Sequence, residues 1–467
     1  MNNRGERLAK NTIIIALGNV GSKVLQVILV PFYTRVMSSE EFGTVDLLQA
    51  IVALLLPISV LSIFEAVFRM AMDKKYDKEK VLYNGLIISI IGSTVLCLVA
   101  IPFAMFLNKT YVWLVVINTI AVAFWTLFSR YVKAVGKTML FAVNNIVLTA
   151  VILLLNILFL VVFHLGIFGY MLAYIFANII ATIMLVIYIK NDIKICKREI
   201  NKLLLKEMIV YSVPLVLNGI CWWLSNFTDR VMITNILGPS ANGLYAAASK
   251  MPHLVSVFAM IFFQAWEISA NEEIESRDKT EFYSRIYSGV ICFAFISGAT
   301  LILLCRPLTK IMLGEEYYSS WQIMPWLVIS AVAFSLSAFF VSLYTACKKT
   351  KMAFFTNLIC VIVNVCLNFF LIIRIGTIGA AMATAAAYIV LWIVRVYDTR
   401  TIMRLDCKII KTVISFALLI VGSVVVSRFE SWLSYFICLV IVLVMAIINW
   451  NQLMDIAIFF VSRIRKK

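Results

Sequence analysis

The sequence predicts an all-α membrane protein that crosses the bilayer many times. Of its 467 residues, 63% are hydrophobic and 14% are charged, and the mean hydropathy is +0.98. This composition is too apolar for an ordinary soluble domain. Apolar runs of about 20 residues, the length that an α-helix needs to cross the hydrocarbon core, recur along the whole chain. We therefore expect about fourteen transmembrane helices and no large soluble domain.

The expected spans follow these apolar runs in order. The first comes directly after the polar stretch MNNRGERLAK, and it is too long for a signal-peptide core and lacks a small-residue cleavage site, so we interpret it as a membrane helix. The expected spans are 12–33, 45–68, 81–107, 111–128, 140–163, 167–189, 208–237, 244–266, 286–304, 323–344, 353–373, 378–394, 409–426 and 433–448.

The basic residues are distributed as in a membrane protein. The net charge of +17 is concentrated in alternate connections such as KNDIKICKREINK, CKKTK and the terminal SRIRKK, whereas HLG and GPSAN carry almost none of it. Connections rich in Lys and Arg face the cytoplasm, so both termini are predicted to be cytoplasmic and the number of spans is even. The charge therefore gives no reason to expect nucleic acid as a partner.

Cysteine and histidine are not arranged for metal or redox chemistry. The ten cysteines form no CxxC pair, and His164 and His253, the two histidines, stand in no metal-ligand spacing. We predict free thiols, with no metal, no cofactor and no catalytic residue.

The two halves of the chain repeat each other. Each half has a Lys-Thr pair followed by two asparagines at the same spacings, and then a GxxGxxxA phrase, LGIFGYMLA or IGTIGAAMA. Such residues also serve generic helix packing, but agreement over both phrases favours a duplication. The paired positions are Lys137, Thr138, Asn145 and Asn156 in the first half, and Lys349, Thr350, Asn357 and Asn368 in the second.

Six helices in each copy make a parallel repeat, because an even number brings the chain back to the same side of the membrane. We predict an N-lobe over residues 1–200, a C-lobe over 201–400, and two additional helices with an amphipathic cytoplasmic tail over 401–467. Two such lobes are expected to face each other across a central cavity.

Three basic residues lie inside the predicted spans: Lys23, Arg230 and Lys250. A charge in the middle of the bilayer costs about 2.5–3.5 kcal/mol on insertion scales, so each one needs a protein-lined or watery environment. Lys23 falls roughly 16 Å along the first helix, near mid-membrane. Asp229 is open to two interpretations, because it either neutralises Arg230 in a structural ion pair or faces a ligand.

Further candidates lie nearer the helix ends. Arg35 can reach the lipid headgroups from its helix end, and Glu65 and Arg69 are spaced to form a pair within one helix, so structural roles compete with cavity roles here. Asn145 and Asn357 are the repeat asparagines that we propose as supporting or coupling residues. A cavity in which basic residues outnumber acids suits an anionic cargo, above all a phosphate or pyrophosphate group.

Three stretches resemble a known family. PFYTRVMSSEEFGTVDLLQAI at 31–51, FTDRVMITNILGPSANGLYAAASKMP at 227–252 and the GxxGxxxA phrases resemble the polysaccharide-biosynthesis flippases, the Wzx-type branch of the multidrug/oligosaccharidyl-lipid/polysaccharide exporter superfamily. The resemblance spans most of the chain. Lys23 is inferred from its depth alone. The residues that match the family pattern are Arg35, Arg69, Asp229, Arg230, Tyr245 and Lys250.

The resemblance implies two six-helix lobes in a V around a cationic cavity in the bacterial cytoplasmic membrane. It implies alternating access that moves an undecaprenyl-pyrophosphate oligosaccharide, a precursor of O-antigen, capsule or exopolysaccharide, to the outer leaflet. Polysaccharide polymerase and chain-length proteins are the partners that it implies besides the lipid bilayer.

Three other functions compete with this one. A lipid II flippase has a similar helix count and a basic cavity, whereas a drug exporter of the same superfamily calls for an acidic cavity. A membrane sugar polymerase or glycosyltransferase usually has a large extracytoplasmic loop or an acidic motif. The acid-rich stretch EISANEEIESRDKTEF has no DxD and is expected to be a solvated linker, so we expect a protein that is not an enzyme.

Overall fold

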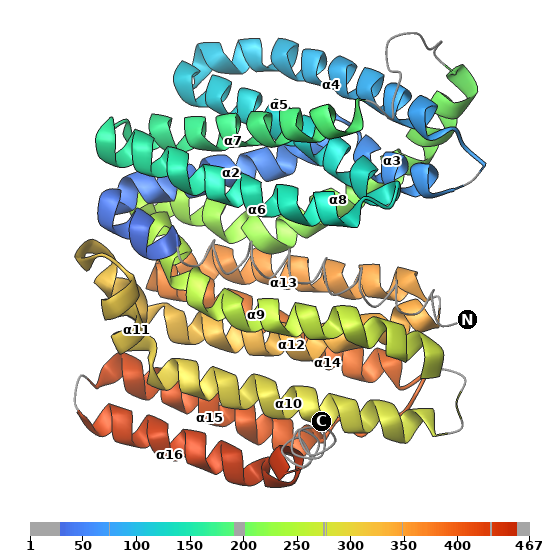
Figure 1. Ribbon diagram of the computed structural model, residues 1–467. Coiled ribbons are helices and arrows are strands. Elements are labelled where there is room, and N and C mark those ends of the chain that lie inside the picture. The colour runs from blue at the N-terminus through green and yellow to red at the C-terminus, as the bar shows by residue number, and fades with distance from the viewer. Residues whose placement is uncertain are drawn as a thin grey trace, which may run out of the picture. The chain divides into compact units, whose positions relative to one another are not determined.

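The computed structural model describes residues 29–73, 75–190, 201–273, 276, 278–347, 349–429 and 432–454, and within these ranges it is helical with no strand (Figure 1). Residues 29–36 are helical. The elements that follow are α2 (Ser39–Ser59), α3 (Ile63–Met72), α4 (Lys78–Phe106), α5 (Lys109–Ala134), α6 (Thr138–Asn156), the π-helix η1 (Ile157–Val162), α7 (Gly166–Ile189), α8 (Lys202–Leu237), α9 (Pro239–Glu273), α10 (Lys279–Leu303), α11 (Cys305–Met312), the 3₁₀-helix η3 (Glu315–Gln322), α12 (Met324–Ala346), α13 (Thr350–Ile375), α14 (Thr377–Thr399), α15 (Ile409–Arg428) and α16 (Trp432–Ile448).

Hydropathy confirms a polytopic membrane protein. Among the described residues, 11 helices are long and apolar enough to cross a membrane, and α16 is a further apolar helix of 17 residues. Many isoleucine, leucine and phenylalanine side chains on these helices are exposed, as expected for surfaces that face acyl chains. Most of the predicted first span, 12–33, lies outside the described residues.

The predicted span 45–68 is wrong as a single helix, because α2 and α3 divide it. Pro57 lies close to the end of α2, and Leu61 and Ser62 take left-handed backbone conformations with φ of 51° and 50°. A helix does not continue through two such residues. Gly92 of α4 packs on this break, since a Cβ there would lie 2.0 Å from the Ser59 carbonyl oxygen.

The chain forms two compact units, Met1–Phe227 and Thr228–Lys467, and the division falls within α8. In the first unit α3, α4, α5 and the start of α8 share a core that contains Val67, Leu127 and Met208. Trp223, further along α8, donates from its indole N–H to the Ala50 carbonyl at 2.6 Å. The first part of α8 therefore packs with the helices that precede it, and the predicted division at 200 and 400 remains a prediction.

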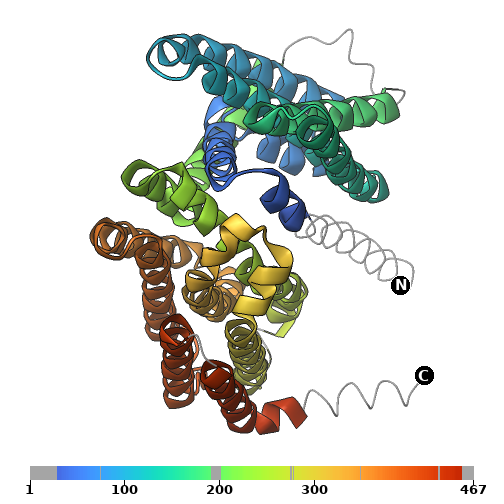
Figure 2. The same ribbon diagram turned by 90° about the vertical axis from the view of Figure 1, so that its left-hand side faces the viewer.

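In the second unit α12 packs against α9, α10 and α14, while α13 packs on α14. Helices α15 and α16 lie side by side (Figures 1 and 2), and both contact α10. Aromatic rings fill the centre of this unit: Trp266 stacks on Phe339 at 5.3 Å, and Tyr287 lies 4.9 Å from the same ring. This packing holds the helices on which the candidate site is built.

The repeated glycine phrases form the same kind of corner in both units. Gly166 and Gly376 have φ of 50° and 68°, and a Cβ on Gly379 would lie 2.2 Å from the Leu371 carbonyl oxygen. Positive φ and close approach both require glycine. The first copy has two residues more between its second asparagine and its corner. The π-helix η1 lies in this segment, and π-helical turns accommodate inserted residues.

Candidate functional site

The predicted site residues fall into both units. In the described part of the first unit are Arg35, Glu65, Arg69 and Asn145, and in the second are Asp229, Arg230, Tyr245, Lys250 and Asn357. Lys23 lies outside the described residues.

Asp229 is the centre of a buried polar network in the second unit. Its side chain, in α8, accepts hydrogen bonds from the Tyr245 hydroxyl of α9 at 2.8 Å, from the Asn368 amide of α13 and from the Thr384 hydroxyl of α14. Asp229 is 8% exposed and Asn368 is fully buried. Three neutral donors stabilise a carboxylate that would otherwise be costly to bury.

Asn364 extends this network by one helical turn. Its side-chain carbonyl accepts from Asn368 at 3.0 Å, and its amide donates to the Thr384 hydroxyl oxygen at 3.3 Å. The Thr384 hydroxyl also lies 3.0 Å from the Ala380 carbonyl oxygen. Because a hydroxyl has one proton, Thr384 donates either to Asp229 or to Ala380, so the network has two hydrogen-bonding arrangements.

The sequence singled out part of this network. Asp229 and Tyr245 were expected as site residues and Asn368 as a repeat position, but Thr384 and Asn364 were missed. The sequence holds one signal for Asn364, because it lies four residues before Asn368 and therefore shares a helix face with it. Nothing in the spacing pairs that face with Asp229, which lies more than a hundred residues earlier.

Glu65 pairs with a residue of another helix. The Glu65 carboxylate lies 2.9 Å from the Arg130 guanidinium of α5, and the Glu65 and Arg130 side chains are 31% and 37% exposed. From the sequence, a pair with Arg69 within the same helix was considered instead. Arg130 and Lys133 also lie over the Phe68 ring, at 5.8 and 5.5 Å. Arg69 and Arg35 are exposed. Glu65 thus forms an ion pair that joins α3 to α5.

Asn357 holds a buried arginine that the sequence did not single out. Arg395 is 2% exposed, and its guanidinium donates to the Asn357 carbonyl oxygen at 2.9 Å, the Ser337 backbone oxygen at 2.8 Å and the Thr356 hydroxyl at 3.2 Å. These bonds join α12, α13 and α14. A structural role for Asn357 is sufficient to explain this contact.

The repeat partner of Asn357 is in a different setting. Asn145 is half-buried, and the described residues show no hydrogen bond from its side chain. Its neighbour Asn144 is buried, accepts from the Trp125 indole at 3.0 Å and donates to the Ala181 carbonyl at 3.0 Å. In the first copy, the asparagine whose side chain joins neighbouring helices is therefore Asn144, one residue before the repeat position Asn145.

The fold is similar to those of several transporters of known structure. The lipid II flippase MurJ, in an inward closed conformation, has a similar structure, with a TM-score of 0.70 and 15% identity over 95% of this chain and 100% of that one. A superfamily transporter from Pyrococcus furiosus has a TM-score of 0.60 with 11% identity over 85% and 95%. The Vibrio cholerae MATE transporter VcmN has a TM-score of 0.58 with 15% identity over 85% and 97%.

Within this class, the sequence identifies the family. The model for the family described as polysaccharide biosynthesis protein matches residues 8–266, more than half of the chain, so the chain belongs to that family. The MatE model matches residues 214–370. An uncharacterized membrane protein of Methanocaldococcus jannaschii is 24% identical over 430 residues, which cover 86% of this chain and 100% of the relative. The protein is a multi-pass membrane protein of the polysaccharide biosynthesis family.

Proposed function

We propose that this protein is a flippase that moves undecaprenyl-pyrophosphate-linked oligosaccharide repeat units across the bacterial cytoplasmic membrane by alternating access. The observation that carries the proposal is the match to the polysaccharide biosynthesis family over residues 8–266. The fold shared with MurJ, which is described as a lipid II flippase, supports a lipid-linked sugar as the cargo class. Movement of such a molecule requires no covalent chemistry.

The cationic residues are proposed to hold the pyrophosphate and the sugar next to it, while the polyprenyl tail stays in lipid. These residues are Lys23, Arg35, Arg69, Arg230 and Lys250. Arg35 and Arg69 have exposed side chains, and Arg230 and Lys250 are half-buried within α8 and α9. Several cations sharing one pyrophosphate give stronger binding than one, because each phosphate offers several acceptor oxygens.

Asp229 is proposed as the group that couples transport to a proton or another monovalent cation. A carboxylate that is buried among neutral donors is stabilised by a positive charge, and a cation bound to it would compete with the hydroxyl donors for its oxygens. Thr384 would then lose its acceptor and donate to Ala380 instead. Because the network joins α8, α9, α13 and α14, its state affects how these helices pack. Glu65, Tyr245, Asn145 and Asn357 are proposed as supporting residues.

Two alternative cargoes rest on specific observations. Similarity to MurJ over 95% of this chain keeps lipid II as a candidate. The MatE match over 214–370 keeps a drug-like cation as a second candidate. Transport of a labelled polyprenyl-pyrophosphate oligosaccharide in competition with lipid II, and then with a cationic dye, separates the three.

Complementation tests the cationic residues. We expect Lys23→Gln, Arg230→Gln and Lys250→Gln each to abolish complementation of a flippase-deficient strain while membrane abundance stays unchanged. Lys202→Gln, at an exposed position at the start of α8, is the matched control and should complement normally. Normal complementation by all three site variants would remove these residues from the binding site.

A further inference from the structure

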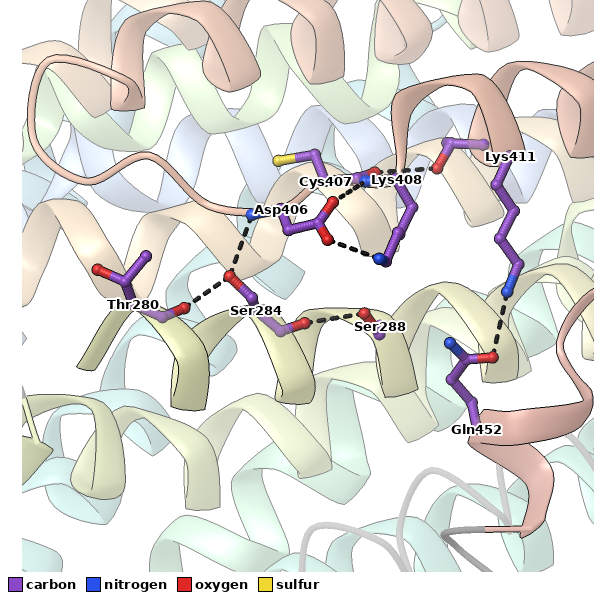
Figure 3. Close-up of polar contacts among 9 residues, drawn as sticks. Thr280, Ser284, Ser288, Asp406, Cys407, Lys408, Lys411 and Gln452 are labelled. Atoms are coloured by element: carbon purple, nitrogen blue, oxygen red, sulfur yellow. Dashed lines mark hydrogen bonds and ion pairs between the residues drawn. The ribbon is translucent and has the colours of Figure 1, made fainter. Parts of the chain in front are cut away.

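A pocket lies where the connection after α14 enters α15, next to the end of α16. Residues 405–411 form most of its wall, together with Ile414 and Ile448, and its volume is about 830 Å³. Figure 3 shows Lys408 turned toward Asp406 and Lys411 reaching from α15 toward Gln452. The lining residues all belong to the second unit, and none of the proposed cargo-binding residues that the structure describes is among them.

The charge of this pocket is positive. The Lys408 ammonium lies 2.6 Å from the Asp406 carboxylate, and the Lys411 ammonium donates to the Gln452 side-chain oxygen at 3.1 Å. Hydrogen bonds from Lys408 hold the pKa of the Asp406 carboxyl below its usual range, so this acid stays ionised. The wall thus carries two ammonium groups and one carboxylate, and each ammonium has donor hydrogens beyond the one used in the described bond.

An apolar surface adjoins these charges. Ile410 is 79% exposed and Ile414 is 46% exposed, one turn apart at the start of a membrane-spanning helix. Helix α15 begins here, and the backbone N–H groups of its first turn add a partial positive charge. A molecule that satisfies both surfaces has an anionic head and an apolar tail.

We propose that this pocket binds the headgroup of an anionic phospholipid such as phosphatidylglycerol, with Lys408 and Lys411 on the phosphate and Ile410 and Ile414 along an acyl chain. The apolar wall favours a lipid over free phosphate, and the net positive charge favours an anionic lipid over a zwitterionic one. The connection, with its further Arg400 and Arg404, is predicted to be cytoplasmic, where anionic lipids attract basic segments. This lipid is a resident ligand of the protein and is distinct from the proposed cargo.

Photolabelling of the full-length protein in bilayers tests this site. The probes are photoactivatable phosphatidylglycerol and phosphatidylcholine, and the readout is the adduct on the peptide that contains residues 405–414. We expect labelling by phosphatidylglycerol to exceed that by phosphatidylcholine, and to fall about tenfold in the double variant Lys408→Gln/Lys411→Gln, since two charge-assisted contacts are lost. Lys351→Gln, at an exposed position of α13, should label like the wild type.

The double variant Lys408→Arg/Lys411→Arg keeps both charges and should keep the labelling, which separates loss of binding from loss of folding. Equal labelling by the two lipids, or unchanged labelling in the glutamine variant, would overturn the proposal. Displacement by glycerophosphate at the same concentration would make the pocket a phosphate site instead. Displacement by polyprenyl pyrophosphate, but not by unlabelled phosphatidylglycerol, would assign it to the cargo.

Discussion

Removal of the Tyr245 hydroxyl should destabilise the second unit measurably. This hydroxyl donates to Asp229 at 2.8 Å, and the two side chains are 4% and 8% exposed. Tyr245→Phe keeps the ring and leaves no large cavity. It deletes a bond to a charged group, which is worth about 1.5–3 kcal/mol, and Asp229 keeps Asn368 and Thr384 as donors, so we expect a loss of about 2 kcal/mol.

A matched variant isolates the bond from the change of residue type. Tyr388 of α14 is half-buried, and the described residues show no hydrogen bond from its hydroxyl, so Tyr388→Phe should cost about 0.5 kcal/mol or less. For a cooperative unit of this size, about 2 kcal/mol corresponds to a lowering of the midpoint of thermal unfolding by roughly 4–8 °C.

A thiol-reactive dye provides the assay. Buried free cysteines become reactive only when the second unit opens, so dye fluorescence against temperature in detergent reports its unfolding. Equal midpoints for Tyr245→Phe and Tyr388→Phe would show that the bond to Asp229 contributes no stability, and the description of the network would then be refuted. The cysteines in question are Cys292, Cys305, Cys360, Cys407 and Cys438.

Three further predictions concern other parts of the structure. Arg395→Leu leaves several buried acceptors unpaired, so we expect a loss of about 3 kcal/mol or more and lower membrane abundance. Asn144→Leu should cost about 1–3 kcal/mol because it removes the bonds to Trp125 and Ala181, whereas Asn145→Leu should cost less than about 0.5 kcal/mol, as measured by thermal unfolding followed by circular dichroism. The Asp406 pKa is lowered in the folded protein, so its contribution to stability is present above about pH 4 and is lost as pH falls through the folded pKa. Asp406→Asn should therefore reduce the drop in the unfolding midpoint between pH 6 and pH 3.

Each of these predictions has a contrary outcome. Wild-type abundance of Arg395→Leu would mean that its guanidinium bonds are dispensable. Equal midpoints for the two asparagine variants would contradict the assignment of the structural role to Asn144. An identical acid response of Asp406→Asn and the wild type would show that this carboxylate does not contribute to the pH dependence.

Hydropathy was sufficient to predict most membrane helices, because length and composition alone determine whether a segment can span. It failed at the break between α2 and α3, where the run LLLPISVLSIFEA stays apolar except for the isolated residues Ser59, Ser62 and Glu65. The signal there was Pro57 followed by two residues in left-handed conformations, and only the first of these features is visible in a sequence.

The site was harder to predict than the fold. Asp229 stood out because a charge within a span is costly, but its partners come from three other helices, and their approach depends on tertiary packing. Glu65 was considered beside Arg69 because sequence reasoning sees neighbours within one helix, whereas Arg130 approaches from α5. Arg395 was overlooked because an arginine at a helix end commonly extends to the headgroups, yet here it turns inward to three acceptors.

The most direct test of the proposed function is reconstitution into liposomes that carry a polyprenyl-pyrophosphate oligosaccharide on one leaflet. Exposure of the sugar to an impermeant modifying reagent is followed with and without an ion gradient. We predict exposure that depends on the protein, is lost in Lys250→Gln, and loses its response to the gradient in Asp229→Asn. No exposure across several glycans, together with efflux of a cationic dye, would contradict the flippase assignment.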